Sequence, residues 1–149
     1  MYKSFLLFLF SFSSSFSENN LYSWIETVPK PWELSHKNID THLTGFHKKF
    51  PNFHDRLIAL NIWRVGTPYG IFCLGEERGV DKDPIIRIDT SDCTVHVLTT
   101  IAFAESKSFN EARDAMIRLH YKPDENGIIE PTYKSRWHFT SDRILNHSK

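Results

Sequence analysis

The segment that follows Asp92 is apolar over so wide an arc that, as a helix, it must be buried inside the fold. Other elements therefore have to pack around it, and the composition allows this, because 40% of the residues are hydrophobic and 24% are charged. A chain of 149 residues is expected to form one domain. Two neighbouring stripes at helical spacing carry the apolar side chains: Val95, Leu98 and Ala102, and Val97, Ile101 and Ala104.

Three further segments have the apolar spacing of helices. The first begins at Ser35 and is ended by Pro51, because proline cannot continue a helix. The second runs from about Asn52 to Val65. The third follows Ser108, which forms a capping box with Glu111.

Three shorter segments have the features of β-strands. Residues 69–74 and 85–88 are apolar runs, and residues 133–140 alternate between two faces. Helical segments precede most of this strand material instead of alternating with it regularly. The sequence therefore predicts an α+β domain and not a doubly wound parallel sheet.

The first 17 residues have the pattern of a secretory signal peptide. An apolar run follows a lysine, and Ser15 and Ser17 supply the small residues for cleavage before Glu18. The run is shorter than the ~20 residues that span a bilayer. We expect residues 18–149 to form an exported domain, periplasmic or secreted, and membrane contact only through an uncleaved signal.

The sequence contains two cysteines, Cys73 and Cys93. In an exported protein a pair of cysteines can form a disulfide. Their settings differ, since Cys73 lies in an apolar run and Cys93 lies at the start of the predicted buried helix. We expect Cys73 to be structural and not bonded to Cys93, with the disulfide as the alternative.

Composition and spacing argue against several classes of function. Lysine plus arginine and aspartate plus glutamate balance at 18 each, so nothing favours a nucleic-acid partner. The sequence has no glycine-rich phosphate loop and no Gly-x-Ser-x-Gly elbow. Four histidines at spacings that match no zinc motif do not predict a metal site: His36, His42, His47 and His54.

Asp-Cys-Thr at 92–94 and His138 supply the residue types that nucleophilic catalysis by a cysteine requires. A thiol attacks as the thiolate, and both a helix N-terminus and a nearby imidazolium lower the pKa of a thiol. His138 shares its predicted strand face with Arg136. The alternative is a buried structural cysteine and an ordinary surface histidine.

Two motifs resemble those of a known superfamily. Gly-Thr-Pro-Tyr at 66–69, followed by Asp-Cys-Thr at 92–94, resembles the nucleophile region of the NlpC-type cysteine peptidases of bacterial cell walls. Ser-Arg-Trp-His-Phe at 135–139, followed by Asp142 and Ile144, resembles the second signature of the N-acetylmuramoyl-L-alanine amidase-like proteins within it. The resemblance covers residues 57–146.

This resemblance implies roles for individual residues. Cys93 matches the nucleophile and His138 the general base of a hydrolase that acts on C–N bonds. Tyr69, Asp92 and Arg136 match positions that line the site and bind substrate, with a structural ion pair as the alternative for Arg136. No metal or organic cofactor is implied.

The resemblance also implies a substrate. The expected function is cleavage of an amide bond in peptidoglycan or muropeptides, with N-acetylmuramoyl-L-alanine amidase activity favoured. The alternatives are a stem-peptide endopeptidase of the same superfamily and a catalytically inactive cell-wall binding module.

The fold that the resemblance implies is papain-like and NlpC-type, with the nucleophile helix packed on a small antiparallel sheet. In these relatives a polar group on the strand after the histidine orients the imidazole. Only residues 139–149 follow His138 here. We therefore expect the domain at 18–149 to be incomplete at its C-terminus, without the group that orients the imidazole.

Overall fold

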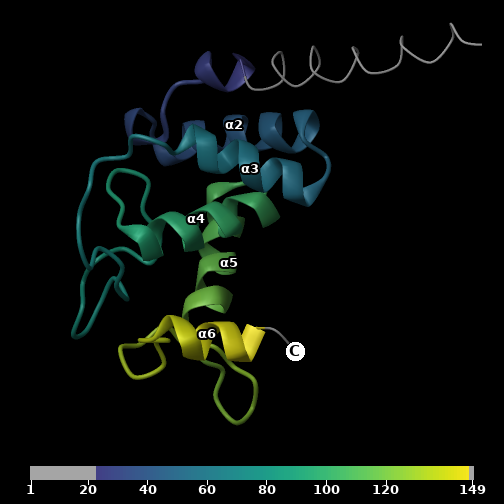
Figure 1. Cartoon of the computed structure of the whole chain (residues 1–149). Coiled ribbons are helices and arrows are strands. Elements are labelled where there is room, and N and C mark those ends of the chain that lie inside the picture. Colours follow the sequence, from purple (N-terminus) through teal and green to yellow (C-terminus); the bar gives the residue numbers. More distant parts are fainter. Residues whose placement is uncertain (1–22, 148–149) are drawn as a thin grey trace, which may run out of the picture.

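The computed structural model describes residues 23–147, so the predicted signal peptide lies outside the described residues (Figure 1). Residues 23–26 are helical and precede a short 3₁₀ helix. The remaining described residues are α-helices joined by loops. In chain order the elements are η1 (Pro31–Glu33), α2 (His36–Lys49), α3 (Phe53–Trp63), α4 (Cys93–Glu105), α5 (Phe109–His120) and α6 (Thr140–His147).

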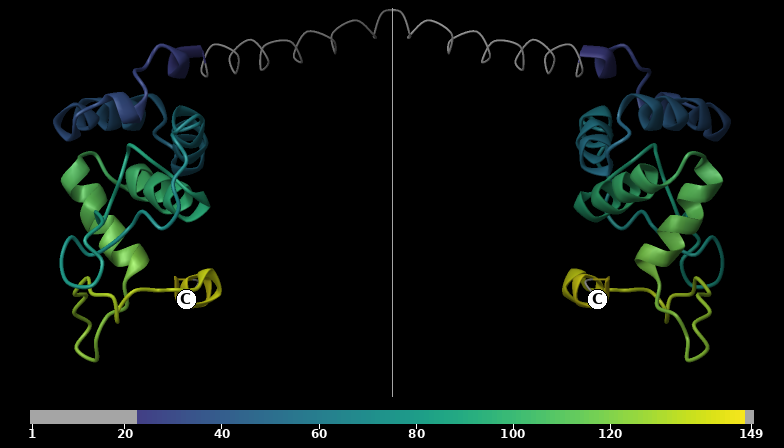
Figure 2. Two further views of the ribbon diagram at one scale, coloured as in Figure 1. Left: turned by 90° about the vertical axis from the view of Figure 1, so that its left-hand side faces the viewer. Right: turned by 90° about the vertical axis from the view of Figure 1, so that its right-hand side faces the viewer.

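Helix α4 lies at the centre of the fold. It packs against α3 and α5, and α6 contacts α5 at the end of the molecule away from α2 and α3 (Figures 1 and 2). Seven of its residues are buried, which confirms that this segment is enclosed, although Val97 on the second predicted stripe is half exposed. The sequence predicts a start at residues 89–92 with Cys93 in the first turn; the helix begins at Cys93, which does lie in its first turn.

Side-chain caps begin the other predicted helices where the sequence places them. The Ser35 hydroxyl accepts from the third residue of α2 at 3.4 Å, and the Asn52 side-chain oxygen accepts from the second residue of α3 at 2.8 Å. The Ser108 hydroxyl accepts from the Glu111 N–H at 3.2 Å at the start of α5. These three helix predictions are confirmed.

The predicted antiparallel sheet, and with it the papain-like fold of a helix packed on a sheet, is wrong. Between residues 23 and 147 the structure has no strand. It has isolated β-bridges only: Tyr69 with Ser91, Arg78 with Asp81, and Tyr121 with Arg136.

Backbone conformation explains why the apolar runs do not form strands. Phe72 has φ 55° and Glu77 has φ 61°, whereas an extended strand needs negative φ at every residue. The chain therefore turns after Phe72, and the backbone hydrogen bonds between loops, such as Gly75 N–H to the Pro84 carbonyl at 3.0 Å, do not extend into a ladder. The isoleucines of the second run, including Ile85, are buried without a ladder of hydrogen bonds.

The alternating segment 133–140 also has another conformation. Residues 132–135 form a turn closed by the Ser135 N–H, which donates to the Thr132 carbonyl at 3.1 Å. A helix that the sequence analysis missed, α6, begins at Thr140. Alternation over so short a segment did not distinguish a strand from a turn followed by a helix.

The core between α2, α3 and α4 is aromatic. Trp63 is fully buried, with its ring centroid 5.0 Å from that of Phe46 and 6.5 Å from that of Phe103. Its indole N–H donates to the Pro29 carbonyl at 2.8 Å, so the polar atom of this side chain is satisfied.

Arg56 connects the ends of two helices. Its Nε donates to the Ala104 carbonyl at 2.7 Å, and its Nη1 donates to the carbonyls of Phe50 and Pro51 at 2.8 and 2.9 Å. The last carbonyls of a helix have no partner within the helix. The buried guanidinium therefore satisfies the C-terminal ends of α2 and α4 together, and its burial lowers the pKa of Arg56.

Replacement of Arg56 by methionine should destabilise the fold by about 2–4 kcal/mol, because three buried or partly buried carbonyls lose their donor. Urea unfolding of the variant measures this loss. The matched control is Lys48→Met, which removes the same charge from an exposed position on α2. Equal stability of the two variants would contradict the role given to Arg56.

Candidate functional site

The Gly-Thr-Pro-Tyr segment lies against the residues that lead into α4. The Ser91 N–H donates to the Pro68 carbonyl at 2.8 Å, and the Gly70 N–H donates to the Ser91 carbonyl at 3.2 Å, which forms the bridge at Tyr69. A Cβ on Gly70 would lie 2.4 Å from the Thr90 hydroxyl oxygen, so this close approach requires glycine. The structure thus brings the two parts of the first motif together.

Asp92 holds both the start of α4 and the loop in front of it. Its Oδ1 accepts from the Val95 N–H at 2.8 Å and caps the helix, while its Oδ2 accepts from the Phe72 N–H at 3.3 Å. The second bond lies at the residue with positive φ. Both carboxylate oxygens are engaged within the fold, and a contact with substrate would have to be shared with these bonds.

A cleft of about 390 Å³ opens beside the start of α4. Three of the predicted site residues line it: Asp92, Arg136 and His138. Cys73 and His120 line it as well, together with side chains from the 133–143 segment. The cleft therefore joins the loop before α4, the end of α5 and the second motif.

Cys93 is exposed at the first position of α4 and lines an adjoining apolar groove of about 360 Å³ between α4 and α6. Thr94, Thr140 and Arg143 line both the cleft and the groove. Within residues 23–147 the structure records no hydrogen bond from Cys93 to His138. The predicted nucleophile lines the groove and the predicted base lines the cleft, and these two adjoining hollows share one surface.

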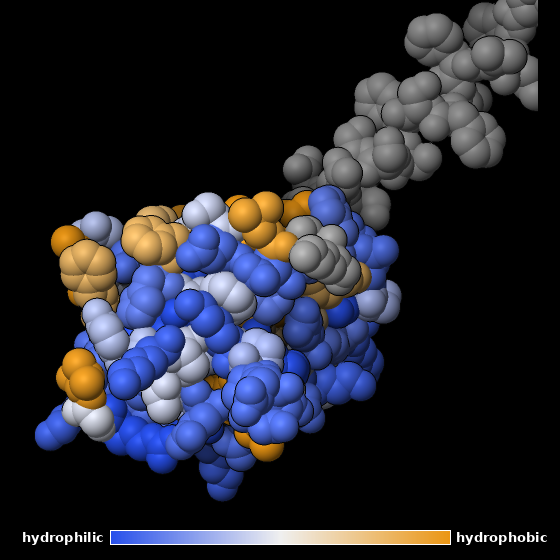
Figure 3. Space-filling view, turned by 90° about the horizontal axis from the view of Figure 1, so that it is seen from below, coloured by the Kyte–Doolittle hydropathy of each residue, from blue (hydrophilic) through white to orange (hydrophobic). Residues whose placement is uncertain are grey.

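Tyr69 forms a β-bridge with Ser91, which precedes the residue that caps α4. Its side chain is three-quarters exposed and lines neither the cleft nor the groove. The face at the α6 end is largely hydrophilic, with its apolar side chains in separate patches (Figure 3).

Both cysteines are free, which confirms that Cys73 is not bonded to Cys93. Cys73 is partly buried against the core, and its Sγ donates to the Ile71 carbonyl at 3.4 Å. Cys73 nevertheless lines the same cleft as His138. The candidate site thus has two thiols in its vicinity, of which only Cys93 begins a helix.

The imidazole of His138 is oriented by the backbone. Its Nε2 lies 2.9 Å from the Tyr133 carbonyl oxygen, and the two rings pack with centroids 4.8 Å apart. A carbonyl only accepts, so in this contact Nε2 carries the hydrogen, and in the neutral ring Nδ1 is the acceptor. A backbone carbonyl of the same loop therefore fixes the orientation of the imidazole.

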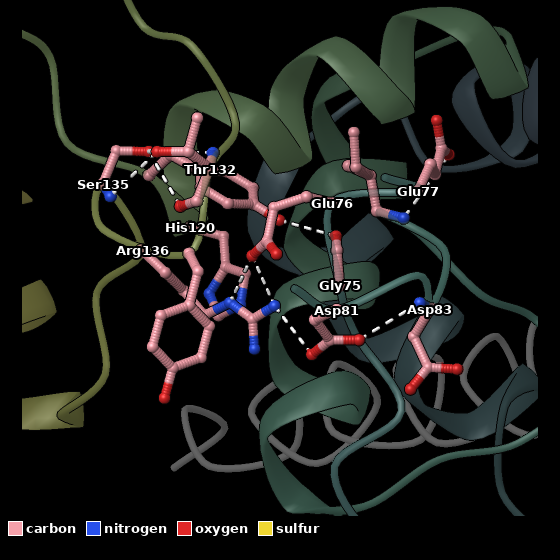
Figure 4. Close-up of polar contacts among 12 residues, drawn as sticks. Gly75, Glu76, Glu77, Asp81, Asp83, His120, Thr132, Ser135 and Arg136 are labelled. Carbon is pink, nitrogen blue, oxygen red and sulfur yellow. Dashed lines mark hydrogen bonds and ion pairs between the residues drawn. The ribbon is translucent and has the colours of Figure 1, made fainter. Parts of the chain in front are cut away.

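Arg136 forms an ion pair, with partners from the loop before α4 and not from its own segment (Figure 4). Its Nε donates to Glu76 at 2.8 Å, its Nη2 also contacts Glu76, and the same Nη2 donates to Asp81 at 2.9 Å. Glu76 is only 3% exposed. Beside this pair, the Tyr121 hydroxyl donates to the Gly75 carbonyl at 2.7 Å, so α5 and the loop are tied together.

The ion pair shifts the pKa of Asp81 and that of Arg136. Burial by itself would raise the pKa of Asp81, but the hydrogen bonds from Arg136 and from the Asp83 N–H, together with the charge of Arg136, outweigh it and lower that pKa. Burial would lower the pKa of Arg136, but the bonds to Asp81 and Glu76 raise it. The three side chains together hold the loop before α4 against the second motif.

His120 ends α5 and is 5% exposed. Its Nδ1 lies 3.1 Å from Nη2 of Arg143, and because arginine only donates, Nδ1 must be the acceptor of a neutral ring. Burial, together with the positive charges of Arg143, Arg136 and His138, lowers the pKa of His120 to about 3.

Four polar residues of this region were missed in the sequence. Glu76 and Asp81 lie in a charged stretch that looks like a solvated loop, and no spacing rule links them to Arg136. His120 follows the apolar positions of the helix predicted after Ser108, and Arg143 lies beyond the strand predicted at 133–140. The one available signal was the alternative role of Arg136 in a structural ion pair, which requires a partner of opposite charge.

The geometry defines a class of protein. It is an all-α domain with an exposed cysteine at the start of a central helix, beside a histidine-lined cleft. The sequence profile of the N-acetylmuramoyl-L-alanine amidase-like family (AmiA-like) matches residues 62–149. The match spans more than half of the chain, so the protein belongs to this family. It contains α4, Cys93 and His138.

A crystal structure of protein LPG0564 from Legionella pneumophila str. Philadelphia 1, of family DUF1460, is similar in fold, with a TM-score of 0.59 and 24% identity. The alignment covers 74% of this chain and 38% of that protein, so the chain spans well under half of its relative's length. No curated protein matches the chain.

Two further properties concern residues 23–147. No helix there has the length and apolar character needed to cross a bilayer. No three His, Cys, Asp or Glu side chains in that range are grouped so that they could share a metal ion.

Replacement of Arg136 by methionine should destabilise the fold by about 3 kcal/mol, because the buried Glu76 carboxylate loses its partner. Adding Glu76→Gln to that variant should recover part of the loss, since a neutral amide costs less to bury. Urea unfolding of the two single variants and the double variant measures this coupling. Strict additivity of the two changes would contradict it.

Acid should destabilise the protein partly through His120. Its folded pKa of about 3 lies below the unfolded value near 6.5, so between these values the unfolded chain binds a proton that the folded chain does not. Stability should thus fall by up to ~1.4 kcal/mol per pH unit as the pH decreases through this window. His120→Asn should show a shallower slope in urea unfolding between about pH 6.5 and pH 4.

The control for this prediction is His54→Asn, because the side chain of His54 is 78% exposed. The control should keep the slope of the unsubstituted protein. If His120→Asn keeps it as well, His120 is not buried as a neutral ring.

Proposed function

We propose that this protein is a cysteine-dependent amidase that cleaves an amide bond in peptidoglycan or muropeptides, with N-acetylmuramoyl-L-alanine amidase activity favoured. The family match supports an amidase-like function on peptidoglycan. The observation that carries the choice of residues is the exposed thiol of Cys93 at the start of α4, next to the cleft that holds an oriented His138.

Cys93 is the preferred nucleophile because of its place in the helix. The N-terminus of a helix carries partial positive charge, which stabilises a thiolate there. Cys73 has no such position, and its thiol donates to a backbone carbonyl. The choice between the two thiols rests on this difference and on the exposure of Cys93.

His138 supplies the proton transfers in this proposal. Its Nδ1 takes the proton of the thiol, the thiolate attacks the amide carbonyl carbon, and the proton passes to the leaving amine as the C–N bond breaks. Water, deprotonated by the same nitrogen, then hydrolyses the thioester and regenerates the thiol. The first N–H groups of α4 are the natural donors to the oxyanion.

The mechanism requires Cys93 and His138, which line adjoining hollows, to meet in the substrate complex. Catalytic hydrogen bonds commonly tighten only when substrate is bound. Thr94 borders both hollows, so the two residues lie on one continuous surface.

Export fits the same function, because peptidoglycan lies outside the cytoplasm. We propose that residues 1–17 direct secretion and are removed, so that the protein acts in the periplasm or outside the cell. The proposal rests on the sequence pattern of these residues.

Mass spectrometry of muropeptide digests tests the function. The unsubstituted protein should release free glycan and an intact stem peptide. Cys93→Ala should reduce the rate by about 10³-fold or more, because the covalent step is lost. Cys73→Ala should keep the rate within a few-fold and is the matched control.

Other outcomes of this digest each contradict part of the proposal. A cut within the stem peptide would indicate an endopeptidase. Binding of peptidoglycan without any release would indicate a cell-wall binding module. Loss of activity in Cys73→Ala but not in Cys93→Ala would make Cys73, the thiol that lines the cleft, the nucleophile.

A further inference from the structure

Arg143 of α6 lies against the segment that carries His138. Its Nη2 donates to the Trp137 carbonyl at 2.8 Å and lies 3.1 Å from Nδ1 of His120. The Trp137 N–H in turn donates to the His120 carbonyl at 2.9 Å. Both backbone groups of the residue before His138 are therefore held, one by α5 and one by α6.

His120 accepts a hydrogen bond from Arg143 and carries no positive charge that would repel it. It is neutral at neutral pH, because its burial and the surrounding positive charges lower its pKa to about 3. Its neutral ring offers one lone pair, and Arg143 takes it. Both bonds use Nη2 of Arg143, whose two hydrogens reach the His120 ring and the Trp137 carbonyl together.

We propose that Arg143 is a positioning residue for His138, acting through Trp137 and His120. The proposal rests on the proposed role of His138 as general base. His138 and the carbonyl that orients it, at Tyr133, belong to one loop, so their 2.9 Å contact survives only while that loop keeps its shape.

The geometry of the loop explains why this contact needs support. The other backbone bond of its bridge to the end of α5 lies further from the imidazole, where the Ser135 carbonyl accepts from the Lys122 N–H at 2.6 Å. Residues 23–147 contain no sheet, so the segment has no neighbouring strand there to fix its end. Arg143 holds the carbonyl of Trp137, the residue directly before His138.

The experiment measures the tautomer of His138 by long-range ¹H–¹⁵N correlation in the ¹⁵N-labelled protein, alongside kcat and KM on muropeptides. The unsubstituted protein should show the Nε2–H tautomer. Arg143→Met should give a mixture of tautomers and a fall in kcat of about 10²-fold with little change in KM, because the base is misplaced but the substrate still binds.

Substitutions at His120 test the link between the two residues. His120→Leu should behave like Arg143→Met, since the acceptor is lost. His120→Asn should preserve the Nε2–H tautomer and most of kcat, because an amide oxygen can accept from Arg143 in place of Nδ1. Arg143→Lys should be intermediate, as it keeps the charge but not the planar array of donors.

Arg118→Met is the matched control, because Arg118 is exposed on α5 and its replacement removes the same charge. An unchanged His138 tautomer in folded Arg143→Met would overturn the proposal, as would an equal loss of kcat in the control. If Arg143→Met fails to fold, His120→Leu and His120→Asn decide: identical tautomers in both would overturn it.

The tautomer measurement gives a result whether or not the protein is an amidase. If the unsubstituted protein hydrolyses no muropeptide, the amidase proposal fails as such. The tautomer of His138 in the Arg143 and His120 variants then still decides whether Arg143 positions the imidazole.

Discussion

Burial of α4 determines where chemistry can take place in this protein. Because α3 and α5 pack against the helix, most of its side chains are removed from solvent. Its N-terminal end remains accessible, and the thiol of Cys93 is exposed there. The loop before α4 and the segment after α5 meet around this end, and both hollows of the candidate site are found there.

Polar contacts replace a sheet in holding these loops. Arg136 ties the second motif to Glu76 and Asp81, and Asp92 ties the residue with positive φ at Phe72 to the helix start. Burial of charges costs desolvation free energy, so such pairs contribute little net stability compared with apolar packing. Their effect is on geometry, because a guanidinium with two carboxylate partners allows few relative positions of the segments it joins.

The helices were predictable from the sequence because periodicity and capping act over a few residues. The place of Cys93 in the first turn of α4 and the cap at Ser108 followed from such local patterns. The sheet was wrong because apolar runs at 69–74 and 85–88 indicate burial, and burial does not require a strand. The partners of Arg136 lie 55 and 60 residues earlier in the chain, a separation at which local patterns carry no information.

Asp92 illustrates a conflict between folding and chemistry at one residue. A negative charge next to Cys93 disfavours the thiolate, which argues against aspartate before a nucleophile. The structure requires two acceptors at this position, one for the Val95 N–H and one for the Phe72 N–H. Asparagine has one acceptor oxygen and an NH₂ group, so it could cap the helix or hold the loop, but not both. Aspartate satisfies both N–H groups, so the requirements of the fold place a carboxylate at the position before Cys93 where chemistry alone would not select one.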